Sequence, residues 1–251
     1  MVRFILLAFI AIPLLLWKAT LAPKANMSQE ETSLAVAELV NEPLKLDYDS
    51  LVGVGKNKQA EFALAYKRAA SKKGKHAVIE ESRQWLFSHL TKNVWPSWYG
   101  TAWDFNGISN VPQEGQIACG YFVSTTLKHV GFNLNRYRLA QQGATAICKA
   151  LTPELLRFSD LDSLDSFLEK KAGNHLYVIG LDYHVGFLAE DSSGHVFTHA
   201  SYFDPVEVTS QRFDESAVLE SSEVYVVAPF LDSDALIKDW LLGVQVYPKA
   251  R

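Results

Sequence analysis

The chain has 251 residues and a formal net charge of −4; 48% of its residues are hydrophobic and 21% are charged. This composition is that of a globular protein long enough to bury a full core, which argues against a disordered or fibrous chain. No block of Lys and Arg is long enough to indicate a nucleic-acid-binding tract, so nucleic acid is not an expected partner.

The first residues differ in kind from the rest. Arg3 is followed by an unbroken apolar run, residues 4–17. A positive residue before an apolar stretch of this length is typical of a secretory signal peptide, and the run is short for a membrane span. Pro23 disfavours cleavage just before it, so residues 1–22 are predicted to be a signal peptide or an uncleaved signal anchor. The folded part is expected to be secreted or periplasmic, attached to the membrane through residues 4–17 if the segment is retained.

Residues 23–94 are predicted to form a helical N-terminal region. Apolar residues recur at helical spacing over residues 58–70 and again over residues 78–90. This pattern predicts two amphipathic helices that pack against the rest of the protein. Neither helix carries a pattern that indicates chemistry.

An aromatic segment, residues 95–107, comes next. Its three tryptophans and two glycines suit neither a regular helix nor a regular strand, so a loop is predicted. Binding residues concentrate on loops held by a rigid scaffold, and Trp98 and Trp103 are therefore candidate residues for one wall of a cleft. A loop that folds onto the core is the alternative.

Cys119 precedes a run in which apolar residues recur at three- and four-residue steps, and Gly131 is a helix stop signal. Cys119 is therefore expected at a helix N-terminus, where unpaired N–H groups and the helix dipole lower the pKa of a thiol. This makes Cys119 a candidate nucleophile. The alternative is a buried structural cysteine, since free Cys is among the most buried residue types.

Helices and then strands are predicted in the second half of the chain. The helices are expected over residues 136–149, 153–158 and 161–171. The strands are expected over residues 175–181, 184–189, 195–200, 206–209 and 223–228, with the first three forming an antiparallel meander. A last helix is capped by Asp232 or Ser233 and runs to Leu242. This order of elements predicts an α+β fold.

Two histidines flank one predicted turn of the meander. His184 begins one strand and His199 ends the next, so the two side chains can lie beside each other. Next to a cysteine, His184 would take the thiol proton and His199 would orient His184, as in a catalytic triad. His195 falls on the turn and ranks below His199. The residues could instead bind a metal, but the close ligand spacings typical of zinc sites are missing, so no metal or cofactor is expected.

These ordered motifs resemble the NlpC/P60 branch of the papain-like cysteine peptidases. Those proteins carry Asp-Cys-Ser-Gly-Phe-Val opening a helix, His-Val-Gly beginning a strand, and a polar residue, often within His-Ala-Ser, ending the next strand. The matching stretches here are Cys119-Gly120-Tyr121-Phe122-Val123, His184-Val185-Gly186-Phe187 and His199-Ala200-Ser201. Trp98-Tyr99-Gly100 looks like the family's Tyr-x-x-Gly-Gly region. The resemblance covers about residues 95–201.

The resemblance implies a papain-like catalytic core at residues 95–230, followed by a C-terminal helix and tail at residues 231–251. It implies a thiol hydrolase that cleaves amide bonds, with the stem peptides of bacterial peptidoglycan as the favoured substrate and no cofactor. Tyr99 would lie near the nucleophile and help to hold the oxyanion. Ala118 replaces the aspartate of the family motif, and Asp104 is a candidate for part of that aspartate's work.

A competing interpretation comes from the cysteine count. The chain has two cysteines, Cys119 and Cys148, and in an oxidising compartment they could form one disulfide. The protein would then be a non-catalytic binding or structural domain, and the histidines would be structural. A second alternative is another acyl transfer by the same triad, which one fold can also host.

Overall fold

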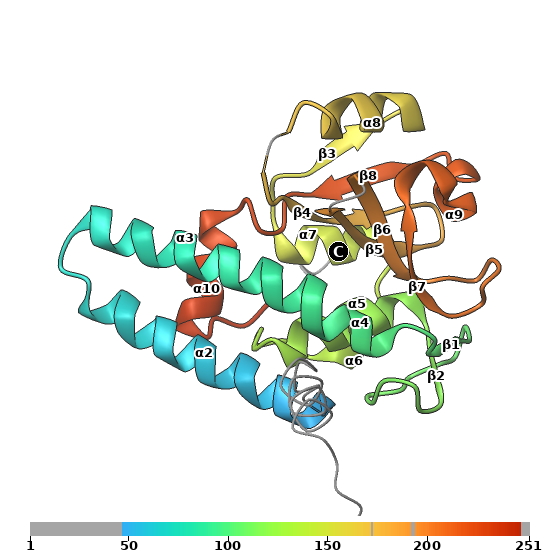
Figure 1. The fold of residues 1–251 in the computed structure, drawn as a ribbon. Coiled ribbons are helices and arrows are strands. Elements are labelled where there is room, and N and C mark those ends of the chain that lie inside the picture. The colour runs from blue at the N-terminus through green and yellow to red at the C-terminus, as the bar shows by residue number, and fades with distance from the viewer. Residues whose placement is uncertain (1–46, 172, 192–193, 247–251) are drawn as a thin grey trace, which may run out of the picture. The chain divides into compact units, whose positions relative to one another are not determined.

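The computed structural model describes residues 47–171, 173–191 and 194–246, which belong to one compact unit spanning Leu46–Arg251 (Figure 1). The predicted signal segment, residues 1–22, lies outside the described residues. Within the described part of the chain, no helix is long and apolar enough to cross a membrane.

The centre of the fold is a six-stranded antiparallel sheet with the strand order β3-β8-β4-β5-β6-β7. Its strands are β3 (Leu156–Phe158), β4 (Leu176–Gly180), β5 (Val185–Asp191), β6 (Gly194–Ala200), β7 (Val208–Arg212) and β8 (Tyr225–Ala228). Strands β4, β5 and β6 follow one another as the meander that the sequence predicts. With the helices described next, this sheet confirms the α+β class.

Ten helical segments, a 3₁₀ turn and a short parallel strand pair complete the described fold. They are α2 (Tyr48–Arg68), α3 (Lys72–His89), the π-helical η1 (Leu90–Val94), α4 (Trp95–Trp98), α5 (Cys119–His129), α6 (Arg136–Ala140), α7 (Ala144–Leu151), α8 (Leu161–Leu168), α9 (Ala217–Glu220) and α10 (Asp234–Leu242), with the pair β1 (Ala102–Trp103) and β2 (Gln116–Ile117). A single 3₁₀ turn, η2 (Phe213–Glu215), follows β7.

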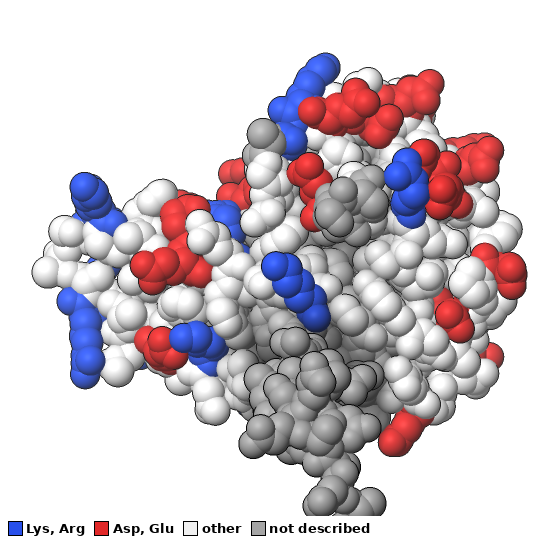
Figure 2. Space-filling model, in the orientation of Figure 1, with Lys and Arg blue, Asp and Glu red and all other residues white. Residues whose placement is uncertain are grey.

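Both faces of the sheet are covered, which explains why the central strands are almost continuously apolar. Alternate side chains of β4 enter two different hydrophobic clusters, because successive residues of a strand point to opposite faces. Leu176 and Val178 join the larger cluster with α2, α3, α5, α7 and α10, and Tyr177 and Ile179 join a smaller cluster with α8 and α9. Figure 2 shows acidic side chains gathered over α8, whose sequence includes Asp162 and Asp165.

Local signals set several helix ends. The two N-terminal helices are longer than predicted, because the side chains of Asp47 and Ser71 cap α2 and α3 by accepting hydrogen bonds from backbone N–H groups. Ser233 caps α10 in the same way, which confirms the predicted start of the last helix. Helix α5 stops before Gly131, which has a φ of +99° that favours glycine, and this confirms the predicted stop.

Three predicted elements are wrong. Residues 156–158 form strand β3 and not a helix, because they pair with the edge of β8 far along the chain. The helix predicted over residues 136–149 is two helices, separated by a loop at residues 141–143. Residues 95–98 form helix α4 and not a loop. Pro96 is tolerated in a first helical turn, and the side chains of Trp95 and Trp98 are buried.

Candidate active site

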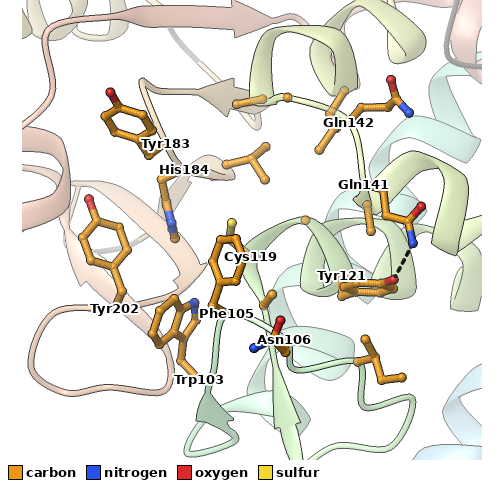
Figure 3. Close-up of a pocket in the computed structure, with 18 of the residues that line it drawn as sticks. Trp103, Phe105, Asn106, Cys119, Tyr121, Gln141, Gln142, Tyr183, His184 and Tyr202 are labelled. Carbon is orange, nitrogen blue, oxygen red and sulfur yellow. Dashed lines mark hydrogen bonds between the residues drawn. The ribbon is translucent and has the colours of Figure 1, made fainter.

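A pocket of about 620 Å³ opens between the start of α5 and the turn that joins β4 to β5. Cys119 is the first residue of α5, and His184 immediately precedes β5; both line the pocket. Figure 3 shows the His184 ring pointing toward Cys119 inside this pocket. The structure therefore brings together the predicted nucleophile and the predicted base, which lie 65 residues apart in the sequence.

Cys119 begins α5 as predicted, but its thiol is not acidified. Burial raises the pKa of the Cys119 thiol, and the backbone N–H groups of Val185, Gly120 and Cys119 oppose that rise only in part. The expected lowering of this pKa is wrong, because partial burial in the pocket lining disfavours a thiolate more than the helix N-terminus favours it. The resting thiol is therefore protonated at neutral pH.

A chain of hydrogen bonds runs from His184 into the sheet. Nε2 of His184 lies 2.9 Å from Nδ1 of His199, and Nε2 of His199 lies 3.1 Å from Oε1 of Gln211. His184 and His199 are 2% and 0% exposed, so water does not compete for these contacts. The predicted histidine pair is thus side by side, and a third polar residue extends it.

This chain selects the proton positions on both rings. The Gln211 carbonyl oxygen can only accept, so His199 must donate from Nε2. A neutral His199 then has a bare Nδ1, which accepts from Nε2–H of His184. Neutral His184 is left with its lone pair on Nδ1, the form in which an imidazole can take a proton.

Burial also keeps both rings neutral. The pKa of His184 is held well below its ordinary value, first by burial and then by the neighbouring His199. Burial lowers the pKa of His199 to about 4, and the hydrogen bond to Gln211 opposes this shift. A protonated thiol therefore faces a neutral imidazole at neutral pH.

Aromatic packing holds the two rings in place. Phe197 stacks on His199 with ring centroids 4.1 Å apart, and Tyr202 meets the His184 ring edge-on at 5.2 Å. Gly186 lies under this packing, because a Cβ atom there would come within 2.5 Å of the Phe197 ring. A side chain at residue 186 would displace the stack.

The candidate residues of the aromatic segment do not all line the pocket. Trp103 lines the pocket, and its buried indole N–H has no hydrogen-bond partner among the described residues. Trp98 is 0% exposed and donates from Nε1 to the Tyr48 hydroxyl at 2.6 Å, so its assignment to the cleft wall is wrong.

Tyr99 and Asp104 do not line the pocket either. The Tyr99 side chain packs against the larger core cluster, and its carbonyl oxygen accepts a hydrogen bond from the Gln113 side chain at 3.4 Å. Oδ1 of Asp104 accepts from the backbone N–H of Asn106 at 2.8 Å, which stabilises a local turn. The sequence analysis placed both residues near the nucleophile, but the described pocket lining includes neither of them.

The alternative disulfide is also wrong. Both cysteines are free. Cys148 is completely buried on α7, where its thiol donates weakly to the carbonyl oxygens of Val178 and Val226 in the sheet.

The described residues contain no group of three or more His, Cys, Asp or Glu side chains that could hold a metal ion.

Sequence reasoning missed several residues of the pocket and its support. Gln211 lies in β7 directly across from Phe197 and diagonally across from His199, beyond the predicted end of that strand. Extending the predicted strand at residues 206–209 by two residues would have reached Gln211. Tyr183, Tyr202, Gln141 and Gln142 line the pocket from turns and loops, where no periodic pattern marks a residue.

Comparison of this chain with protein-family models, with curated proteins and with solved structures finds no match. Any assignment of function therefore rests on the residues of this pocket and on the motifs that they form in the sequence.

Proposed function

We propose that this protein is a papain-like thiol hydrolase of the NlpC/P60 type that cleaves amide bonds. One observation carries the proposal: Cys119 at the start of a helix faces an imidazole whose free nitrogen is set by the His184–His199–Gln211 hydrogen-bond chain. In this assignment Cys119 is the nucleophile and His184 is the general base and acid. His199 and Gln211 are positioning residues.

The first step starts from neutral groups. Sγ of Cys119 attacks the carbonyl carbon of the amide while its proton moves to Nδ1 of His184, so that a C–S bond and an imidazolium form together. The negative charge that develops on the carbonyl oxygen is stabilised by the backbone N–H at the start of α5. Because burial raises the pKa of the thiol, proton transfer to His184 is needed for attack.

The second step releases the amine. The imidazolium of His184 gives its proton to the leaving nitrogen as the C–N bond breaks, which leaves an acyl group on Cys119 as a thioester. A water molecule then attacks this thioester with His184 as the base. The acyl group leaves as a carboxylic acid, and the thiol of Cys119 is regenerated.

The substrate class follows from the sequence resemblance. Peptide bonds in the stem peptides of peptidoglycan are the favoured substrate, and the apolar run at residues 4–17 favours action outside the cytoplasm. This reaction calls for no metal and no cofactor.

The proposal is tested by removing the nucleophile. Peptidoglycan fragments are incubated with the native protein and with Cys119→Ala, and the peptide products are measured by mass spectrometry. We expect Cys119→Ala to lower the cleavage rate by more than about a thousandfold, because no other group can form the thioester.

The matched control is Cys148→Ala, which removes the other thiol from a site without access to the pocket. We expect it to keep its cleavage rate within about threefold of the native rate while losing about 1 kcal/mol or more of stability from the core. Equal cleavage rates for native protein and Cys119→Ala would refute the proposal.

A further inference from the structure

The proposed reaction develops negative charge on the carbonyl oxygen of the substrate amide. Oxyanion sites usually combine several hydrogen-bond donors, and the backbone N–H at the start of α5 supplies one. The sequence analysis assigned a second contribution to Tyr99, which does not line the pocket. No Lys or Arg is found among the described residues that line it, so a second donor has to be an uncharged group.

Three polar side chains on the α6 side of the pocket are engaged elsewhere. Nε2 of Gln141 donates to the Tyr121 hydroxyl at 3.4 Å, and Nε2 of Gln142 donates to the carbonyl oxygen of Arg138 at 3.1 Å. Figure 3 shows the Tyr121 hydroxyl turned toward Gln141 and away from Cys119. None of these groups is placed to donate to an oxygen bound beside Cys119.

The polar groups on the His184 side are also poorly placed. The indole nitrogen of Trp103 is buried, so a ligand cannot reach it. The Tyr183 side chain is 93% exposed, and Figure 3 shows its hydroxyl pointing away from Cys119. The Tyr202 ring packs edge-on against His184, on the side where the leaving nitrogen must meet that base.

Asn106 is the remaining donor side chain of the described lining. It is exposed in the pocket, and its side-chain amide makes no hydrogen bond to any described residue. Figure 3 shows Asn106 and His184 on different sides of Cys119. A primary amide carries two N–H donors, so Asn106 can donate to a carbonyl oxygen while His184 handles the proton of the thiol.

The turn that carries Asn106 is bound directly to the start of α5. The backbone N–H of Asn106 donates to Oδ1 of Asp104 at 2.8 Å. The carbonyl oxygen of Gly107 accepts from the N–H of Ala118 at 2.9 Å, so the residue after Asn106 is hydrogen-bonded to the residue before Cys119. The contact is close, because a Cβ atom on Gly107 would come within 2.5 Å of a backbone nitrogen of β2.

Arg136 ties the same segment to α5 a second time. Its guanidinium is 3% exposed, and one terminal nitrogen donates to the carbonyl oxygens of Ile108 and Ser109 at 2.7 and 2.9 Å. Its Nε donates to the Thr125 hydroxyl of α5 at 2.9 Å. Asn106 is therefore held at a fixed place relative to Cys119, as a preorganised donor requires.

We infer that the side-chain amide of Asn106 is the second oxyanion donor. Its N–H donates to the carbonyl oxygen of the substrate amide and strengthens that hydrogen bond as the oxygen becomes negative. The inference rests on the proposed function, which supplies the charge to be stabilised. It makes Asn106 a catalytic residue, with Asp104 and Arg136 as positioning residues.

The test measures kcat and KM for cleavage of one purified disaccharide-peptide fragment of peptidoglycan, with products followed by mass spectrometry. Asn106→Ala is expected to lower kcat by about a hundredfold while KM stays within about threefold of the native value, because the lost hydrogen bond is strongest in the transition state. Asn106→Asp keeps the size of the side chain but removes its N–H donors, and should lower kcat at least as much. Both variants should keep the native melting temperature, since the side chain is exposed.

The matched control is Asn110→Ala. Asn110 is also exposed and lies four residues further along the same loop, outside the pocket lining, so its kcat should stay within about threefold of the native value.

The outcomes separate this inference from the proposed function. A native kcat in either Asn106 variant, while Cys119→Ala is inactive, would overturn the inference and leave the proposed function standing. So would a higher KM with an unchanged kcat, which would indicate ground-state binding, or a loss of kcat with a lower melting temperature in both variants, which would indicate damage to the turn. A native rate no higher than that of Cys119→Ala would overturn both.

Discussion

At the scale of single residues, the candidate site depends on an amide that no motif points to. The Gln211 side chain accepts from His199 and thereby decides which nitrogen of His184 is bare. A histidine pair alone has no preferred direction, because each neutral ring can donate or accept. The pair gains a direction here because the Gln211 amide oxygen, which can only accept, faces Nε2 of His199.

We predict that Gln211→Glu changes the pH dependence of the reaction. A carboxylate beside His199 favours the protonated rings and raises the pKa of the coupled pair. In the native protein the pKa of His184 lies well below its ordinary value, so the rate should fall only as the pH drops far below about 6.5. In the variant this fall in rate at acid pH should move to higher pH by about one unit, measured as kcat/KM for cleavage of peptidoglycan fragments against pH.

The comparison variant for this prediction is Gln211→Leu. It leaves the buried N–H of His199 without an acceptor, which costs about 1–3 kcal/mol of stability. The rate should be lower at every pH, but the pH at which it falls on the acid side should not rise. If the rate fell at the same acid pH in the native protein and in Gln211→Glu, a charge at residue 211 would have no electrostatic effect on the histidines.

At the scale of elements, the β5–β6 hairpin is what delivers both histidines. His184 precedes β5 and His199 lies near the end of β6, and the antiparallel register sets the two rings on the same face. The repeated apolar pattern and the short turn between the strands were enough to predict this from the sequence. The pattern could not predict strand β3, because its pairing partner β8 lies about 70 residues further along the chain.

We predict that Gly186→Ala disturbs this hairpin. The new Cβ would approach Phe197 to 2.5 Å and Cβ of His199 to 2.9 Å, so the stacked rings must move. We expect a loss of about 1–3 kcal/mol in the free energy of unfolding, measured by chemical denaturation, and a lower rate of cleavage of peptidoglycan fragments.

Gly53→Ala is the matched substitution in α2, where an added Cβ meets nothing within 4 Å. It should be neutral or raise stability by up to about 1 kcal/mol, since Ala favours a helix interior. Equal effects of the two substitutions would show that the crowding at Gly186 is relieved without cost.

At the scale of the whole molecule, the core holds histidines that folding keeps neutral. Burial lowers the pKa of His129 and of His199 to about 4 each. In the unfolded chain these groups titrate near about 6.5. The unfolded state therefore binds more protons between these pH values, and stability falls as the pH drops through this window.

We predict that the free energy of unfolding at pH 5 is lower than at pH 7 by about 2 kcal/mol for each of these two histidines. Urea denaturation at the two pH values measures the difference. His129→Gln should reduce the loss by about 2 kcal/mol, because the contribution of this histidine is gone. A pH dependence unchanged by this substitution would contradict the predicted neutral state of His129.

The sequence by itself determined the features that repeat locally or lie close in the chain. Helical spacing and capping residues specify α2, α3, α5 and α10, and strand patterns with short turns specify the meander that carries His184 and His199. Each of these signals is contained within about 25 residues, so it can be recognised before the fold is known.

Only the tertiary structure decided which residues of the aromatic segment face the pocket and what state the thiol has. Trp98 enters the core and Trp103 reaches the pocket, although both lie in one stretch of sequence. The pKa of the Cys119 thiol rises where its helix position predicts a fall. Burial causes both outcomes, and burial depends on how α5, the sheet and distant loops pack around each side chain, which no local pattern encodes.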